Sequence, residues 1–117
     1  MELENNKPPT KFEVGQIAFC LGGYSMRLPS FYRILRRTEK TVWLAEIHSQ
    51  LIEDIDGFGQ VGYMIPIDFI KGDVFYRRIQ YSKYGDFDLK EEYAYKNNFG
   101  KIISPWDGTA KLFDCLD

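Results

Sequence analysis

The chain has very little of the residue types that build metal centres and disulfide frameworks. Its 117 residues include one histidine and two cysteines. Cys20 and Cys115 lie far apart and form no CxxC pair, and His48 is the single possible nitrogen ligand. The sequence therefore predicts no metal site, no disulfide framework and no bound cofactor, and we expect both thiols to be reduced.

Long apolar runs are also missing. The N-terminal segment "MELENNKPPTKFEVG" is polar and acidic, and no later stretch reaches the length of a signal-peptide core or of a membrane-spanning helix. We therefore expect a cytoplasmic protein that does not enter a membrane.

The chain has no excess of charge of either sign. It carries 15 Lys and Arg against 17 Asp and Glu, a net charge of −2, so no overall basic field draws it to nucleic acid or anionic lipid. The distribution is uneven, because residues 1–38 hold six basic and three acidic side chains, whereas residues 39–75 hold two and seven. The sequence therefore allows a local basic surface next to an acidic one.

The motifs of common catalytic and phosphate-binding sites do not occur. The chain has no GxSxG or Cys/His signature, and Gly22-Gly23 is followed by neither a Walker lysine nor a GxGxxG pattern. We interpret Gly22-Gly23 as a structural corner. An enzyme would have to work through His48 or Asp107, which we interpret instead as a strand-end residue and a turn residue.

Apolar residues, in contrast, are plentiful enough for a folded core. Hydrophobic residues make up 44% of the chain and aromatic residues 16%, too many for a disordered protein. Residues 1–11, with two asparagines and two prolines, are expected to form a flexible lead-in. Residues 12–117 are expected to form a single β-rich domain.

Short runs rich in β-branched and aromatic residues recur along this domain, separated by glycine, proline and charged residues. Six or seven such runs predict a mainly β fold with at most one short helix. We expect a small antiparallel barrel or a strongly bent sheet of the SH3-like or OB-like kind. The expected strands are residues 14–21, 31–38, 41–48, 61–67, 73–82, 93–104 and 110–116.

The most specific local prediction is a tight antiparallel hairpin. The runs 31–38 and 41–48 are separated by Glu39-Lys40 alone. Apolar residues of the second run alternate between both faces, so both faces are expected to be covered. Val42 and Leu44 fall on one face, and Trp43, Ala45 and Ile47 fall on the other.

Residues 49–56 allow two interpretations. Ser49 and Glu53 stand near capping-box spacing and could open one helical turn, with an acidic loop as the alternative. The carboxylates of Glu53, Asp54 and Asp56 lack the spacing of a calcium loop, so we interpret them as an acidic surface. Such a surface could mimic nucleic-acid phosphate toward a basic partner. A second acidic group follows at Asp86, Asp88, Glu91 and Glu92.

Two further expectations concern strand ends. Pro66 is expected to end the strand 61–67 or to place it at a sheet edge. The runs 93–104 and 110–116 are separated by a turn signal at residues 105–109, and they predict a closing hairpin.

Arginine and aromatic residues are interleaved in two of the expected strands. The pattern resembles the strand surface on which single-stranded nucleic acid stacks. The alternative is a solvated face on which Arg stems cover apolar surface. Trp, Tyr and Arg are also the residues that most often anchor protein interfaces. The candidate contact residues are Tyr32, Arg33, Arg36, Arg37, Tyr76, Arg77, Arg78 and Trp106.

Short motifs follow one another in a recognisable order, namely Gly23-Tyr24, Phe31-Tyr32, Lys40-Thr41-Val42, Gly62-Tyr63 and Trp106-Asp107-Gly108. In this order the chain resembles a family of small, mostly uncharacterised proteins encoded by bacteriophages, plasmids and other mobile elements of bacteria. Members commonly carry Trp before the Gly-Tyr pair and Asp after it. This chain has Gly22 and Ser25 there, so a family site at these positions would be altered.

The resemblance and the missing catalytic motifs together lead to our first hypothesis. It is a non-enzymatic accessory protein that binds and occludes a host or defence protein, as CRISPR inhibitors do. The alternative is a small barrel that binds single-stranded nucleic acid. An enzyme working through His48 or Asp107 is the third hypothesis.

Overall fold

The computed structural model describes residues 9–22, 28–83, 90–96 and 101–114. These residues form eight strands in one antiparallel sheet, which confirms the mainly β prediction. No helix long and apolar enough to cross a membrane occurs among them. The strands are β1 (Ile17–Gly22), β2 (Leu28–Arg37), β3 (Thr41–Asp54), β4 (Val61–Arg78), β5 (Gln80–Lys83), β6 (Lys90–Tyr95), β7 (Ile102–Pro105) and β8 (Lys111–Asp114).

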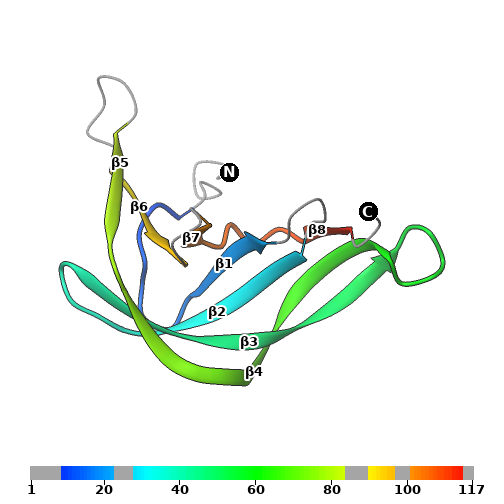
Figure 1. The fold of residues 1–117 in the computed structure, drawn as a ribbon, viewed down its shortest axis with the longest axis horizontal. Helices are drawn as coiled ribbons and strands as arrows, with labels where there is room; N and C mark the ends of the chain where they lie inside the picture. The colour runs from blue at the N-terminus through cyan, green and yellow to red at the C-terminus, as the bar shows by residue number, and fades with distance from the viewer. Residues whose placement is uncertain (1–8, 23–27, 84–89, 97–100, 115–117) are drawn as a thin grey trace, which may run out of the picture.

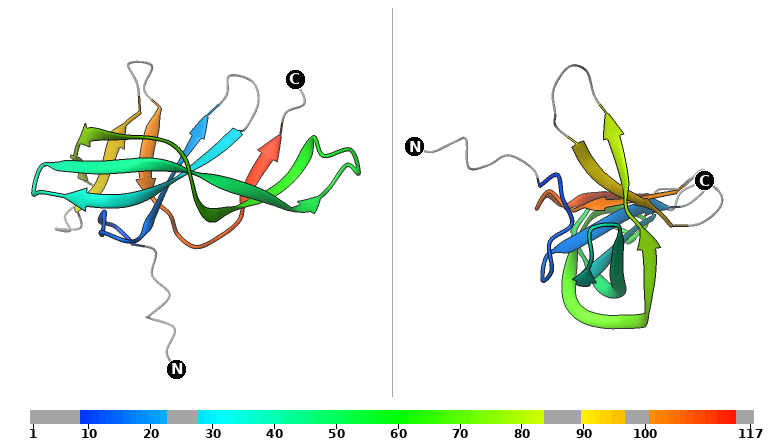
Figure 2. Two further views of the ribbon diagram at one scale, coloured as in Figure 1. Left: turned by 90° about the horizontal axis from the view of Figure 1, so that it is seen from below. Right: turned by 90° about the vertical axis from the view of Figure 1, so that its left-hand side faces the viewer.

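The sheet is curled, and one short connection shows why. Its strand order is β5-β6-β7-β1-β2-β3-β4-β8, so β5 lies at one edge and β4 lies beside the other. Ile79 alone joins β4 to β5, and its side chain is buried. The sheet must therefore curl until β5 approaches β4. Figure 1 shows β4 curving around the lower side of the molecule and rising into β5, and the end-on view in Figure 2 shows the same curl.

The predicted hairpin of β2 and β3 is confirmed. Thr38 closes its turn, because its Oγ1 accepts hydrogen bonds from the N–H groups of Lys40 and Thr41 at 3.3 and 3.1 Å. Both faces of β3 are covered, as expected. Val42 and Leu44 are buried on one face, and Ala45 and Ile47 are buried on the other.

The inner face of the sheet, the side to which Leu44 points, carries the main core. Burial of one such side chain stabilises the fold by about 1.5–3 kcal/mol. Cys20 is a free thiol in this core, and burial raises its pKa. Cys115 lies outside the described residues. The core residues are Phe12, Ala18, Cys20, Tyr32, Ile34, Val42, Leu44, Ile79, Ala94 and Ile103.

A buried ion pair ties the N-terminal segment to this core. Glu92 is 3% exposed, and its Oε1 and Oε2 accept hydrogen bonds from Arg37 at 2.7 and 3.0 Å. The Phe12 N–H also donates to Oε1 at 2.8 Å, and the Glu92 N–H donates to the Thr10 carbonyl. Burial raises the pKa of Glu92, but the bonds from Arg37 and Phe12 outweigh it and hold the pKa below its ordinary value.

The outer face, the opposite side of the sheet, is partly covered by the segment between β7 and β8. The Trp106 ring meets Phe31 edge-on at a centroid distance of 6.0 Å, and the backbone N–H of Trp106 donates to the Ile17 carbonyl. The chain is thereby carried across the sheet, and β8 pairs with β4 instead of β7. The predicted closing hairpin is therefore wrong, because packing on Phe31 prevents the chain from reversing at residues 105–109.

Of the two interpretations of residues 49–56, the helical turn is wrong. β3 continues to Asp54 and pairs with β4, with Ser49 opposite Pro66. The backbone of Ser49 therefore lies within the ladder and does not start a helix. The carboxylate of Asp54 accepts hydrogen bonds from two loop N–H groups and that of Asp56 from three, and together they stabilise the turn between the strands.

β4 does not end at Pro66 but continues to Arg78. On its second edge β4 pairs with β8 only over Val61–Met64. Among the described residues no strand pairs with this second edge at Pro66, which supports the edge interpretation, and the continuation of β4 excludes termination. The ladder between β3 and β4 shifts register twice between Ile67 and Val74, so β4 bulges outward in this region.

Candidate binding surface on the outer face

A bulge in β2 decides which of two neighbouring arginines faces outward. The register with β3 shifts between Ile34 and Arg36, so Leu35 has no partner of its own. Arg36 therefore lies on the outer face, opposite Trp43, and Arg37 lies on the inner face. The predicted arginine cluster is thus divided between the two sides of the sheet.

Three of the five predicted arginines make ion pairs or hydrogen bonds with other segments of the protein. Arg37 pairs with Glu92, as described above. Arg33 forms an ion pair with Asp68 at 2.7 Å. Arg77 donates to the carbonyl of Lys96 through Nε and Nη2 at 3.2 and 2.9 Å. These three side chains hold strands together, and their prediction as contact residues has no support in the geometry.

Two of the predicted aromatic contact residues, Tyr32 and Trp106, pack against other residues of the protein. Tyr32 is buried on the inner face and packs edge-on against Phe75 at a centroid distance of 5.6 Å, so its prediction as a surface contact is wrong. Burial raises the pKa of its phenol. Trp106 is half-buried, packs on Phe31 and donates through Nε1 to the Thr109 carbonyl at 2.7 Å. Strand alternation explains why Tyr32 is buried. Its neighbour Arg33 points to the outer face, so Tyr32 points to the inner face.

The remaining predicted residues gather at one end of the outer face. Arg36 and Tyr76 lie on either side of Trp43, in a row across β2, β3 and β4. The Cζ atom of Arg36 is 4.6 Å from the Trp43 ring centroid, and the Trp43 and Tyr76 centroids are 6.3 Å apart. Val74 and Arg78 flank Tyr76, because alternate residues of a strand share a face. We call Arg36, Trp43, Val74, Tyr76 and Arg78 the outer patch.

The outer patch is exposed and positively charged. Tyr76 is 65% exposed and Val74 57%. Neither Arg36 nor Arg78 is in an ion pair with another described residue. Sequence reasoning missed Trp43 and Val74 as surface residues. Alternation in the hairpin correctly predicted that Trp43 and Leu44 lie on opposite faces. The contacts of Trp43 with Arg36 and Tyr76 depend on the registers of the β2–β3 and β3–β4 ladders, which the sequence does not reveal.

More exposed apolar side chains lie earlier in β4, where the strand bulges. Phe69 is 70% exposed and Ile70 is 52% exposed. The Phe69 ring meets the ring of His48 at a centroid distance of 6.4 Å. His48 itself is exposed at the surface, and its described ring contact is this apolar one. The position suits an interaction surface better than a catalytic base.

The predicted acidic surface is only partly free. Asp54 and Asp56 use their carboxylates to stabilise the β3–β4 turn, while Glu53 is exposed. In the second acidic group Glu92 is buried against Arg37, and Glu91 is exposed. Asp86 and Asp88 lie outside the described residues.

Asp107 is part of a tightly bonded turn. Its Oδ1 accepts from the N–H and hydroxyl of Thr109 at 3.0 and 2.6 Å, and Lys111 Nζ donates to both carboxylate oxygens at 2.9 and 3.0 Å. Partial burial opposes ionisation, but these bonds lower the pKa to about 2. These bonds commit the carboxylate to the turn, which it stabilises.

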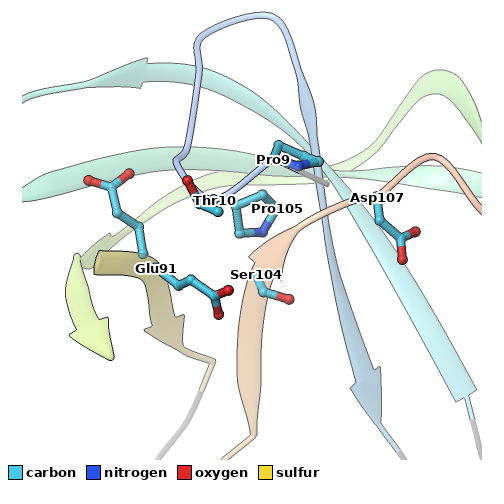
Figure 3. Close-up of a pocket in the computed structure, with 7 residues that line it drawn as sticks. Pro9, Thr10, Glu91, Ser104, Pro105 and Asp107 are labelled. Carbon is cyan, nitrogen blue, oxygen red and sulfur yellow. The ribbon is translucent and has the colours of Figure 1, made fainter. Parts of the chain in front are cut away.

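A small hollow lies beside the N-terminal segment (Figure 3). Pro9 and Thr10 border it next to Ser104 and Pro105, with Glu91 and Asp107 on either side. Its volume is about 200 Å³, below the ~300–1,000 Å³ typical of small-molecule pockets. Glu92, which also lines it, already accepts bonds to both oxygens. The buried carboxylate at this hollow is thus engaged within the protein.

No group of three or more His, Cys, Asp or Glu side chains that could hold a metal ion occurs in the described part of the chain. None of the protein-family models, curated proteins or solved structures compared with the chain matches it. The outer patch and the exposed apolar residues of β4 are thus the strongest candidate site on geometric grounds.

Proposed function

We propose that the protein is a non-enzymatic binding protein that acts by covering the surface of another protein. The supporting observation is the outer patch, in which exposed Val74 and Tyr76 lie beside Trp43 and two arginines without ion-pair partners. Aromatic and arginine side chains carry most of the binding energy in protein interfaces. Exposed apolar surface of this kind on a small protein commonly marks an interaction site.

The proposed partner is a host or defence protein of a bacterial cell, and the proposed location is the cytoplasm of that cell. The resemblance to proteins of bacteriophages and plasmids motivates both. We further propose that the curled sheet is a small barrel of the SH3-like or OB-like kind. The one-residue connection from β4 to β5 supports this, because it brings the two ends of the sheet close together.

The test begins with capture of a partner from nuclease-treated bacterial lysate on the immobilised protein. Binding of the purified partner is then measured by calorimetry. Tyr76→Ala should weaken binding about thirtyfold or more if Tyr76 is an anchor. Tyr95→Ala, at an exposed tyrosine of β6, is the matched control and should bind as the wild type does. Equal binding by Tyr76→Ala and the wild type would exclude the outer patch.

A second candidate function is binding of single-stranded nucleic acid. The Arg36 guanidinium stacked on Trp43, with Tyr76 and Arg78 on the same face, favours it. Bases stack on aromatic rings and arginine planes, while cations neutralise phosphates.

Fluorescence anisotropy with a single-stranded oligonucleotide across a salt series tests this candidate. The double variant Arg36→Gln, Arg78→Gln should reduce the salt-dependence slope by about 1.4, or about 0.7 for each lost phosphate contact. Arg33→Gln is the control, because Arg33 already pairs with Asp68. Binding that does not depend on salt would rule the candidate out.

A further inference from the structure

β4 has one hydrogen-bonding edge that no other described strand uses along most of its length. β3 pairs with β4 from Gly62 to Arg78, whereas β8 pairs on the opposite edge only from Val61 to Met64. Beyond Met64 the backbone groups of this second edge have no strand partner among the described residues. An unpaired edge of this length is a template for a strand of another chain.

The same strand exposes apolar side chains on both faces. Ile70 and Val74 lie on the outer face, opposite Ile47 and Ala45 of β3, while Ile67 lies on the inner face, opposite His48. A partner that docks flat on one face would leave the other face uncovered. A strand added along the edge supplies cross-strand neighbours on both faces at once.

Two charges of opposite sign flank Gly72 on this strand, Lys71 before it and Asp73 after it. An antiparallel second copy of β4 reverses their order. Each lysine can then lie opposite the aspartate of the other copy, so the edge complements itself in charge.

We infer that two copies of this chain associate about a two-fold axis at Gly72, with β4 antiparallel to β4 of the second copy. Residues equally distant from Gly72 then lie opposite each other. Ile70 faces Val74 of the second copy, which pairs exposed apolar residues of the outer faces. Lys71 faces Asp73 of the second copy, which pairs opposite charges.

The charges on the edge select this register. An axis at Lys71 would place the two Lys71 side chains opposite each other, and an axis at Asp73 would do the same to the two Asp73 side chains. Like charges directly opposite are destabilising. Both side chains are exposed. Lys71 lies 3.7 Å from Glu46, and Asp73 has no ion pair with another described residue. Asp73 is therefore available to Lys71 of a second copy.

The association has a consequence for the outer patch. The two sheets continue into each other, so the patches of both copies lie on the same side of the dimer. A partner with two matching sites gains avidity from such an arrangement. The dimer itself does not depend on the proposed function, because its contacts are the edge and bulge of β4.

Sedimentation velocity across the micromolar range tests the inference with the full chain. The wild type is expected to be a dimer. Asp73→Lys places Lys71 opposite a lysine, and it should weaken the dimer roughly tenfold or more, because the symmetry repeats the pair twice. Val14→Lys, at an exposed residue far from β4 in the sequence, is the matched control and should leave the dimer intact.

A charge exchange makes the test specific for the register. The double variant Lys71→Asp, Asp73→Lys restores opposite charges across the axis and should recover the dimer. Circular dichroism of each variant verifies that it is folded. A monomeric wild type overturns the inference, as does a dimer that Asp73→Lys leaves unchanged or that the double variant fails to restore. Binding of a protein partner by monomeric Asp73→Lys would separate this result from the fate of the proposed function.

Discussion

Arg36 and Arg37 are neighbours in the chain, yet one contributes to an exposed surface and the other to a buried ion pair. Arg37 points to the inner face, where it is bound to Glu92 and helps to enclose the core. Arg36 points to the outer face, where it stacks on Trp43 beside exposed Tyr76. On the inner face the side chains satisfy one another. On the outer face apolar and charged groups remain available to another molecule.

The largest expected difference between the faces concerns apolar side chains. Leu44→Ala removes a fully buried inner-face side chain and should lower the free energy of unfolding by about 2–5 kcal/mol. Val74→Ala, on the exposed outer face, should change it by less than about 0.5 kcal/mol when both variants are measured at a concentration low enough to keep the chain monomeric. Urea denaturation of both variants measures the contrast. Similar losses would show that Val74 is part of a core.

The two neighbouring arginines provide the next contrast. Arg37→Ala leaves the Glu92 carboxylate buried without its ion-pair partner, which should cost about 3 kcal/mol of unfolding free energy. Arg36→Ala removes an exposed stacking contact and should cost less than about 1 kcal/mol. Chemical denaturation of the two variants measures both values. Equal effects would contradict the assignment of the two side chains to different faces.

Two glycines of β4 sharpen the comparison between its paired and its free edge. A Cβ atom at Gly62 would overlap the Glu53 carbonyl oxygen, whereas a Cβ at Gly72 would meet only the Glu46 Cβ at 3.8 Å. Gly62→Ala should therefore lower the melting temperature, with a loss of about 1–3 kcal/mol. Gly72→Ala, its control, should leave the melting temperature nearly unchanged. A harmless Gly62→Ala would argue against the close approach of β3 and β4 there.

The smallest expected effect is the pH dependence that Glu92 contributes. Its pKa in the folded protein lies below the ordinary value of 4.5, so its stabilising effect is complete above about pH 4.5 and is lost as the pH falls through the folded-state pKa. The unfolding free energy of Glu92→Gln should be lower at neutral pH and should decrease less on acidification. Urea denaturation between about pH 7 and about pH 3 measures this. Identical pH profiles would mean that Glu92 is not preferentially ionised in the folded state.

Local patterns in the sequence were sufficient to predict the β2–β3 hairpin. Residues on both sides of Glu39-Lys40 have strong strand preference, and alternation in β3 separates Leu44 from Trp43 without any knowledge of distant contacts. The mainly β class follows from the same local signals. The face of each side chain in β3 was predictable for this reason.

The segments that were predicted wrongly depend on distant partners. Ser49 and Glu53 have helical spacing, but pairing with β4 supplies their backbone hydrogen bonds. The expected closing hairpin failed because Trp106 packs on Phe31, more than seventy residues earlier in the chain. Neither contact leaves a signal within a short window of sequence.

The sequence by itself determined the strand-rich fold, the hairpin and the alternation of buried and exposed residues, because these follow from the preferences of neighbouring residues. The tertiary structure decided which arginines are free and which aromatic residues form the outer patch. A single bulge at Leu35 turns Arg36 to the outer face and Arg37 to the inner face, the reverse of what regular alternation from Ile34 would give. Bulges and sheet curvature result from the packing of whole strands, so they become visible only when the strands are assembled.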